Sequence, residues 1–186
     1  MPSSIKVHTI HRTLLISIVG FILIFLITGI NFISAMFVDE AHHTLEKHTR
    51  SWAKLIADKS ISAIETNDHD KLHTSLKDLK VMEFINYVHI YRFTDSEKQL
   101  EFFTSYNKNA NYPAIPDKSN QIIELSTPRY TQHYLELIAP IMQGNNQYGY
   151  VYIQASNEHI EEFTRKTNII SLIMITMTLL LTLLIM

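Results

Sequence analysis

The apolar residues of this chain are concentrated at its two ends, and the polar residues lie between them. No charged side chain occurs from Thr13 to Val38 or from Thr167 to Met186. At about 1.5 Å per helical residue these runs reach roughly 39 and 30 Å, enough to cross a hydrocarbon layer of about 30 Å. The pattern therefore predicts two transmembrane helices flanking a polar central segment.

The central segment begins with helical periodicity. Small and apolar residues recur at steps of three and four over residues 39–65, which predicts that a long helix continues from the first apolar run. Asn67 and Asp68 interrupt this pattern and supply a candidate N-cap, and three leucines between 72 and 79 predict a second, shorter helix. The stripe on the long helix consists of Ala41, Leu45, Thr49, Trp52, Ile56, Ser60 and Ala63.

Beyond the second helix the period changes to two, which is typical of strands. We expect a mostly antiparallel sheet of about five strands, with a short strand at Gln121–Leu125, a single strand from Tyr130 to Ile138 and a reversal at Gly144-Asn145-Asn146. Pro140 cannot donate to a ladder, so we expect it at the end of its strand. The other expected strands are 87–93, 100–106 and 148–155, with a surface loop over 107–120 and a helix beginning at Asn157.

The predicted fold class is thus α+β, with two transmembrane helices around one extracytoplasmic domain. We assign residues 1–12 to a cytoplasmic N-terminus, 13–38 to the first span, 39–166 to the central domain and 167–186 to the second span. The first apolar run is too long for the h-region of a cleaved signal peptide, which is about 7–15 residues. We therefore interpret this run as a retained anchor.

Charge sets the expected orientation. All 18 acidic residues lie between Asp39 and Glu162, whereas only Lys6 and Arg12 carry charge before the first run. The positive-inside rule then puts the N-terminus in the cytoplasm and the central domain outside, although Arg165 and Lys166 oppose this locally. The expected location is the bacterial inner membrane, with membrane lipid around both spans and a periplasmic central domain.

Composition excludes several function classes. With 16 basic and 18 acidic residues, the chain has no basic footprint for nucleic acid. There is no cysteine, only four glycines, and no arrangement of nucleophile, paired carboxylates or phosphate-binding loop. We therefore expect neither catalysis nor a cofactor in this region.

Candidate ligand residues come from the nine tyrosines of the central domain and from two of its arginines. Tyr148, Tyr150 and Tyr152 share a strand face by alternation, Tyr130 and Tyr134 share another, and Tyr87 and Tyr91 a third. One interpretation is half-buried sheet surface; the other is an aromatic-walled pocket in which Arg92 or Arg129 fixes an anionic ligand. The candidate ligand-binding residues are Tyr91, Arg92, Tyr106, Arg129, Tyr134 and Tyr150.

Histidines leave two further alternatives open. His69 and His73 are spaced i, i+4, so they fit either one edge of a metal site or an exposed, polar helix start. Because no further ligands are evident nearby, we predict no metal site. His42, His43 and His48 fit either a solvated helix face or a pH switch.

Some stretches resemble a known family. The helix around Leu55-Ile56-Ala57, the strands containing Val88–Tyr91 and Phe102–Tyr106, and the hairpin of Glu136–Ile141 with Gly149–Ile153 are similar to the periplasmic CHASE/CACHE-type, PAS-like sensor modules of bacterial receptors. The resemblance covers roughly residues 39–165. It implies a sensor between two membrane helices that regulates a cytoplasmic output such as a diguanylate cyclase, hence cyclic di-GMP signalling, or a histidine kinase.

The expected function is therefore extracytoplasmic signal sensing in a membrane receptor, with a periplasmic protein-binding, inhibitor-regulated module as the alternative. We expect a homodimer packed along the dimer stripe, whose members are Ala41, Leu45, Trp52, Ile56 and Ala63. The second half of the stripe is explained equally well by packing against the sheet of the same chain. The sequence stops inside the second apolar run, which favours a fragment of a longer receptor over a free-standing sensor. The ligand is a small molecule or another periplasmic protein.

Overall fold

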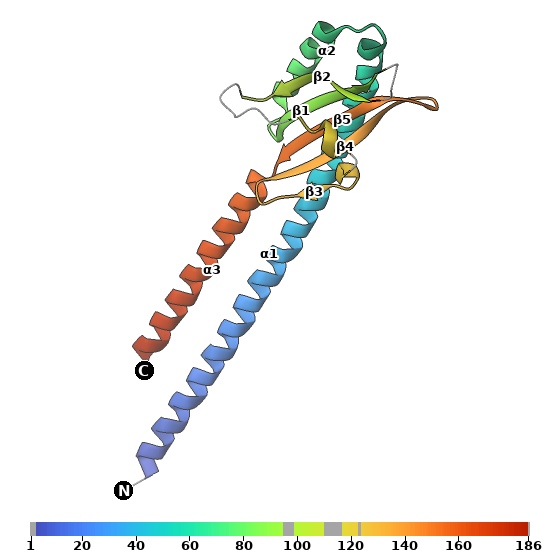
Figure 1. The fold of residues 1–186 in the computed structure, drawn as a ribbon. Helices are drawn as coiled ribbons and strands as arrows, with labels where there is room; N and C mark the ends of the chain where they lie inside the picture. Colours follow the sequence, from blue (N-terminus) through green and yellow to red (C-terminus); the bar gives the residue numbers. More distant parts are fainter. Residues whose placement is uncertain (1–2, 95–98, 110–116, 123, 186) are drawn as a thin grey trace. The chain divides into compact units, whose positions relative to one another are not determined.

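The computed structural model describes residues 3–94, 99–109, 117–122 and 124–185, and Figure 1 shows the order of their helices and strands. Contacts divide the chain into two units, one formed by residues 1–41 with 160–186 and the other by residues 42–159. The elements are α1 (Ser3–Glu65), α2 (His69–Leu76), η1 (Lys77–Val81), β1 (Ile85–Phe93), β2 (Leu100–Asn107), η2 (Ser119–Gln121), η3 (Glu124–Ser126), β3 (Arg129–Tyr130), β4 (Tyr134–Gln143), β5 (Asn146–Ser156) and α3 (Glu158–Ile185).

The α+β class, the long N-terminal helix and the five-stranded antiparallel sheet are confirmed. The strand order is β2-β1-β5-β4-β3, and all four neighbouring pairs are antiparallel. The predicted reversal joins β4 to β5, where Gly144 adopts a φ of 61°. Glycine reaches this left-handed conformation without a steric cost.

Helix α1 ends where the sequence predicts. Asn67 has a φ of 54°, the amide of Asp68 donates to the carbonyl of Ala63 (2.8 Å), and the amide of Asn67 donates to that of Ile64 (3.2 Å). This pair of bonds is a Schellman motif, which satisfies carbonyls that the helix end leaves open. The side chain of Asp68 then accepts a hydrogen bond from the amide of Lys71 and caps α2, as expected.

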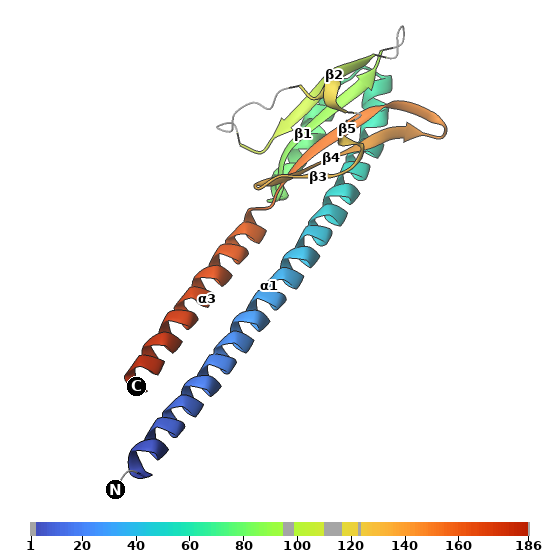
Figure 2. The ribbon, with the colours of Figure 1, turned by 60° about the horizontal axis from the view of Figure 1, so that its bottom comes forward.

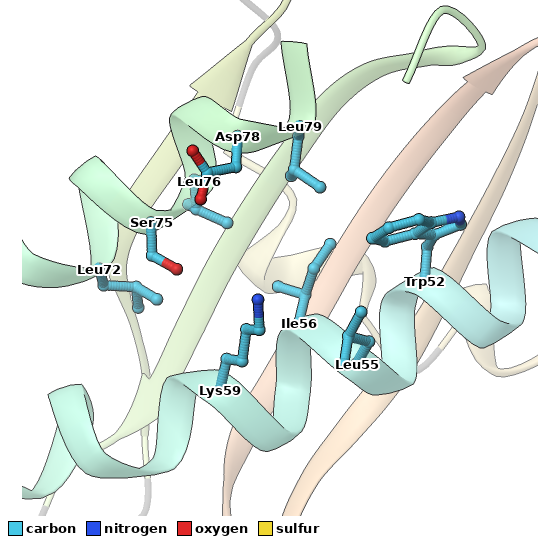
Figure 3. Close-up of a pocket in the computed structure, with 9 residues that line it drawn as sticks. All are labelled: Trp52, Leu55, Ile56, Lys59, Leu72, Ser75, Leu76, Asp78 and Leu79. Atoms are coloured by element: carbon cyan, nitrogen blue, oxygen red, sulfur yellow. The ribbon is translucent and has the colours of Figure 1, made fainter. Parts of the chain in front are cut away.

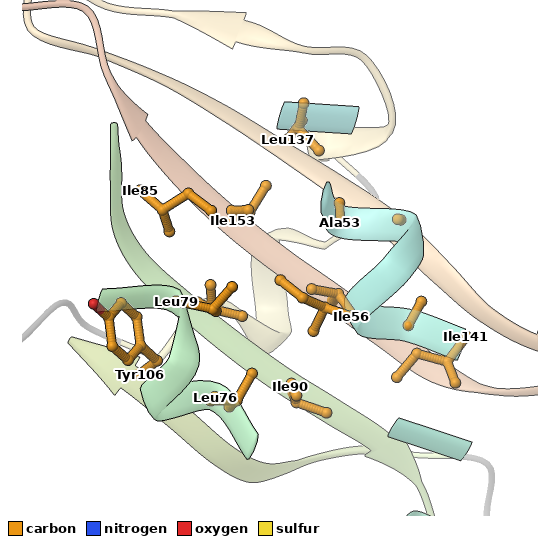
Figure 4. Packing of buried hydrophobic residues seen from close by; sticks show 14 of the residues in the cluster. Ala53, Ile56, Leu76, Leu79, Ile85, Ile90, Tyr106, Leu137, Ile141 and Ile153 are labelled. Carbon is orange, nitrogen blue, oxygen red and sulfur yellow. The ribbon is translucent and has the colours of Figure 1, made fainter. Parts of the chain in front are cut away.

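The main core lies on one face of the sheet, which we call the helix-covered face. Ala53, Ile56 and Ala57 of α1 pack there with leucines of α2 and η1 and with the apolar side chains of β1, β4 and β5 (Figure 4). Thr49 and Ser60 are buried on the same side of α1, and each hydroxyl donates to the carbonyl four residues earlier, so neither is left unsatisfied. The apolar stripe of residues 45–63 thus packs into or against the core.

Three details of the predicted sheet are wrong. The short strand expected at 121–125 is wrong for the residues that the structure describes: Gln121 ends η2, Glu124 and Leu125 belong to η3, and Ile122 and Leu125 are buried, while residue 123 lies outside the described residues. The expected strand from Tyr130 to Ile138 is interrupted by a turn between β3 and β4. Strand β4 also continues past Pro140 to Gln143, because β3 pairs only with Leu135 and Glu136 and leaves the outer flank of β4 open at the proline.

A bulge changes the predicted tyrosine faces. Ile141 pairs with Gly149 but Met142 pairs with Gln147, so Tyr148 is an extra residue in β5. Tyr148 therefore packs against the helix-covered core, whereas Tyr150 and Tyr152 belong to a second cluster. The expectation that these three tyrosines share a face is wrong for Tyr148. Tyr130 and Tyr134 likewise belong to different strands and not to one strand face.

The other unit consists of the first part of α1 and most of α3. The rings of Phe37 and Phe163 lie with their centroids 4.0 Å apart, and a small groove is lined by both helices. Within this unit the two helices run side by side, as both views show (Figure 2). The residues lining the groove are Leu23, Leu26, Ile27, Ile30, Ser171, Met174, Ile175 and Thr178.

Both helices are long and apolar enough to cross a membrane. Their most apolar windows have mean hydropathies of 2.5 in Ile16–Glu65 and 1.7 in Glu158–Leu183, and no part of either window is buried. Polar side chains in these stretches bond to their own helix: Asn31 donates to the carbonyl of Ile27 (2.7 Å) and Thr178 to that of Met174 (2.8 Å). Such bonding removes the cost of placing these groups in an apolar medium.

Gly149 gives a test of the sheet. A Cβ atom at this position would lie 1.9 Å from the backbone oxygen of Tyr91, so Gly149→Ala must push β5 away from β1. We expect a loss of about 3 kcal/mol or more in the free energy of unfolding. The only tryptophan, Trp52, packs against the core, so its fluorescence reports this transition in the full chain.

Gly144→Ala is the matched control for Gly149→Ala. Its Cβ would meet nothing within 4 Å, and only the φ of 61° opposes the substitution, at a cost of about 1–2 kcal/mol. Equal losses for the two variants would contradict the close approach of β5 to β1.

Candidate functional site

The face of the sheet opposite the helices carries a second cluster that differs in chemistry from the first. Tyr91 and Tyr152 are fully buried there together with Ile122 and Leu125, which come from the segment before β3. Leu100, Ile138 and Tyr150 pack around them. This second face therefore combines apolar packing with two buried phenol groups.

Glu136 lies among these residues and is only 1% exposed. Its Oε1 accepts a hydrogen bond from the hydroxyl of Tyr152 (2.7 Å) and lies 3.5 Å from Nζ of Lys118. Its Oε2 accepts from Nε of Arg129 (2.8 Å) and also from Nη2. We call Glu136, Tyr152, Lys118 and Arg129 the Glu136 network, in which one buried carboxylate meets two cations and a phenol.

A second set of polar contacts adjoins the network. The hydroxyl of Tyr91 accepts a hydrogen bond from the backbone amide of Lys118 (2.8 Å) and lies 3.1 Å from Nδ1 of His89. The ammonium of Lys118 also lies 5.9 Å from the centre of the Tyr152 ring, within reach of a cation–π interaction. Lys118 therefore joins the two buried tyrosines through its backbone and its side chain.

The electrostatics of the site follow from burial and pairing. Burial raises the pKa of Glu136, but hydrogen bonds from Tyr152 and Arg129 and the charge of Lys118 outweigh it, so the pKa lies below its ordinary value of 4.5. Burial, followed by the nearby Glu136 carboxylate, raises the pKa of Tyr152, which keeps the phenol protonated as a donor. Burial lowers the pKa of His89 from 6.5, so this imidazole is neutral at neutral pH.

The candidate ligand residues are only partly brought together. Tyr91, Arg129 and Tyr150 belong to the second face, and Tyr134 is half-buried at the start of the same strand as Glu136. Arg92 instead pairs with Glu101 (3.2 Å), bonds to Asn67 and lies over the ring of Phe103. Tyr106 is buried in the helix-covered core. These positions separate Arg92 and Tyr106 from the Glu136 network.

Sequence reasoning missed Glu136, Lys118 and His89. Glu136 stands between Leu135 and Leu137 in a strand that is otherwise largely apolar, and a carboxylate at such a position requires a buried partner. The sequence therefore contained a signal for Glu136. Lys118 carried none, because it lies within the loop expected over residues 107–120, where periodicity does not predict contacts.

The dimer stripe is divided by the structure. Ile56 and Ala63 are buried in the core of their own domain, which is the alternative that the sequence left open for this half of the stripe. Leu45 and Trp52 are half-buried, and Ala41 belongs to the other unit. Of the five residues, only Leu45, Trp52 and Ala41 keep surface for a second copy.

An apolar groove lies between α1 and the segment formed by α2 and η1. Side chains of both segments face one another across it (Figure 3), with Lys59 on one wall and Asp78 on the other. The groove encloses about 160 Å³, and Leu55 beside it is 41% exposed. Its lining residues are Trp52, Leu55, Ile56, Lys59, Leu72, Ser75, Leu76, Asp78 and Leu79.

Two of the histidines for which alternatives were open, His69 and His42, contact aromatic rings. Nδ1 of His69 lies 2.9 Å from the backbone oxygen of Phe103 and its ring stacks on that of Phe103, so this nitrogen is engaged within the fold. Among the residues that the structure describes, no group of three or more histidine and acidic side chains could hold a metal. His42 packs edge-on against Tyr130, with ring centres 5.1 Å apart.

Comparison with models of known protein families found no match, and comparison with curated proteins found none with significant similarity. The site is therefore interpreted from its own geometry.

The Glu136 network predicts a specific dependence of stability on pH. Because the pKa of Glu136 is lower in the folded than in the unfolded chain, its stabilisation is complete above pH 4.5 and is lost as the pH falls below that value. Glu136→Gln should be less stable than wild type at pH 7, by about 1–3 kcal/mol, and the difference should shrink on acidification. Thermal unfolding of the full chain between pH 7 and pH 3, followed by Trp52 fluorescence, measures it.

Glu101→Gln is the control for this experiment, because Glu101 is 49% exposed and pairs with Arg92 at the surface. It should change stability little at any pH. A constant difference between wild type and Glu136→Gln over the whole range would rule out a stabilising charge on Glu136.

Proposed function

We propose that this chain is the extracytoplasmic, signal-sensing input region of a bacterial membrane receptor. The observation that carries the proposal is the continuity of the sensor fold with two membrane-length helices. Helix α1 contains an apolar stretch of spanning length and also supplies the core residues Ala53 and Ile56, and β5 ends two residues before α3 begins. Any change within the sheet is therefore connected through the chain to both helices.

The opposite faces of the sheet support a division of roles in this receptor. The helix-covered face is apolar and holds the domain together, whereas the Glu136 network concentrates charge, phenols and a neutral imidazole on the other face. Sites for small ligands combine apolar walls with a few oriented polar groups. We therefore assign signal recognition to the face that carries Tyr91, Glu136 and Tyr152.

The proposed arrangement places residues 42–159 in the periplasm of a bacterial inner membrane. The CHASE/CACHE resemblance implies a PAS-like sensor whose output is a cytoplasmic diguanylate cyclase or histidine kinase. Two chains associate as a homodimer in this proposal, through the surface around Ala41, Leu45 and Trp52 that the sheet of each chain leaves accessible.

A second candidate function is binding of another periplasmic protein without a small-molecule ligand. The groove between α1 and α2 favours it, because an apolar groove between two helices accepts side chains of a partner. Lys59 and Asp78 on its walls would provide opposite charges for orientation.

The absence of cysteine makes the topology directly testable. In intact cells that express the full chain, a membrane-impermeant maleimide should label Gln132→Cys, an exposed position in the central domain, and leave Ser4→Cys unlabelled. Ser4→Cys should react only after the cells are permeabilised. The reverse pattern, or no labelling of Gln132→Cys from outside, would overturn the proposed function.

Crosslinking distinguishes the two candidate partners. Leu45→Cys treated with a short bis-maleimide should yield a dimer of the full chain, whereas Ile56→Cys should not, since Ile56 is 4% exposed within its own domain. Leu55→Cys beside the groove should remain uncoupled to other proteins if the ligand is a small molecule. A reproducible adduct of Leu55→Cys with a second protein, together with no Leu45→Cys dimer, would favour the protein-binding alternative.

A further inference from the structure

Strand β3 is held in place mainly by its side chains. It contains only Arg129 and Tyr130, and it pairs with just two residues of β4. Arg129 binds Glu136, whereas the hydroxyl of Tyr130 donates to the backbone carbonyl of His42 (3.2 Å) and lies 3.1 Å from Oε2 of Glu46, both in α1. The two adjacent residues of β3 thus connect the Glu136 network to α1.

The turn after β3 is connected to the other helix. Thr131 and Tyr134 close it through three hydrogen bonds, of 2.9, 3.0 and 3.2 Å. Nδ2 of Asn157 donates to the carbonyl of Gln132 (2.8 Å), and the backbone amide of Asn157 donates to that of His133 (3.2 Å). Asn157 immediately precedes Glu158, the first residue of α3.

The Oδ1 atom of Asn157 is buried without a hydrogen-bond partner. Asparagine in the position before a helix usually accepts a hydrogen bond from an amide of the first helical turn through this oxygen. Here the side chain is committed to the turn through Nδ2 instead. In the described part of the chain, buried side-chain atoms lack a partner only at His42, Tyr106 and Asn157, and two of these three residues contact β3 or its turn.

We propose that Asn157 is a two-position switch between the turn of residues 131–133 and the first turn of α3. In the clamped position, which the structure contains, Nδ2 holds the turn and Oδ1 is unsatisfied. In the capped position, Oδ1 accepts from the amide of His159 or Ile160, and the turn is released. The clamped position satisfies the carbonyl of Gln132 and leaves Oδ1 of Asn157 open, and the capped position does the reverse.

The Glu136 network sets the balance of this switch. Arg129 precedes the turn by two residues, and its bonds to Glu136 fix β3 in the place from which Asn157 can reach Gln132. Weakening these bonds therefore favours the capped position. This inference rests on the proposed function, because it makes the switch the step that relays recognition at Glu136 to α1 and α3.

The test uses the full chain in detergent micelles, with a trifluoromethyl tag on Gln132→Cys. Asn157→Asp has no Nδ2 to hold the turn but keeps an acceptor for α3, whereas Asn157→Ala has neither. We expect the ¹⁹F signal of Asn157→Asp to move to the released position. We also expect its His159 and Ile160 amides to exchange with solvent at least about fivefold more slowly than those of Asn157→Ala, the lower end of typical coupling between sites.

The link to the network is tested by Glu136→Gln, which should shift the same ¹⁹F signal toward that of Asn157→Asp. Glu101→Gln removes a surface pairing with Arg92 and should leave the signal unchanged. Equal amide exchange in Asn157→Asp and Asn157→Ala would overturn the switch, and an unchanged signal in Glu136→Gln would overturn its coupling to the network.

A substitute reference and a separate readout complete the test. Where Trp52 fluorescence shows that Asn157→Ala does not fold, wild type replaces it as the reference, and exchange in Asn157→Asp that is no slower than in wild type overturns the switch. Failure of the proposed function is seen separately, as absence of external labelling at Gln132→Cys, and it leaves the ¹⁹F result unaffected.

Discussion

The structure depends on the packing of one half of α1 against the sheet. Ala53, Ile56 and Ala57 have exposed fractions of 4% or less, and full burial of one isoleucine side chain stabilises a fold by about 1.5–3 kcal/mol. Small residues at 53 and 57 let the helix approach the strands closely, while Thr49 and Ser60 satisfy their hydroxyls within the helix. The same helix therefore carries two kinds of surface: an apolar stripe on the side that packs against the sheet, and a stretch from Thr13 to Val38 without a charged side chain on any side.

This constraint explains why polar chemistry gathers on the other face. The helix-covered face must be dry to hold α1, so charged groups that belong inside the domain can lie only under the segment that precedes β3. Glu136 illustrates the consequence: three side chains surround its carboxylate, and breaking one partnership leaves a buried charge with fewer bonds. A domain arranged in this way can respond to a change at the carboxylate without losing its core.

Much of the fold followed from pattern alone, because long periodic segments carry strong signals. The break at Asn67-Asp68, the reversal at Gly144 and the antiparallel strands β1, β2, β4 and β5 were predicted from residue types whose backbone preferences are local. The errors occurred where tertiary context prevailed. Ile122 and Leu125 have the spacing of a turn that covers the sheet. The bulge at Tyr148 follows from the register of β5 against β4, in which Ile141 pairs with Gly149 and Met142 with Gln147, and no local pattern encodes this register. The network was missed for the same reason, since Arg129, Glu136 and Tyr152 meet through the sheet register and Lys118 reaches them from the segment before β3.

The open outer flank of β4 has a consequence for how the molecule behaves at high concentration. Beyond Glu136 no neighbouring strand covers this flank in the described structure, and such an edge can recruit a strand from another molecule. Pro140 lies in the middle of the uncovered stretch and offers no amide to an incoming strand. The residue that appeared to end a strand thus protects the protein against edge-to-edge aggregation.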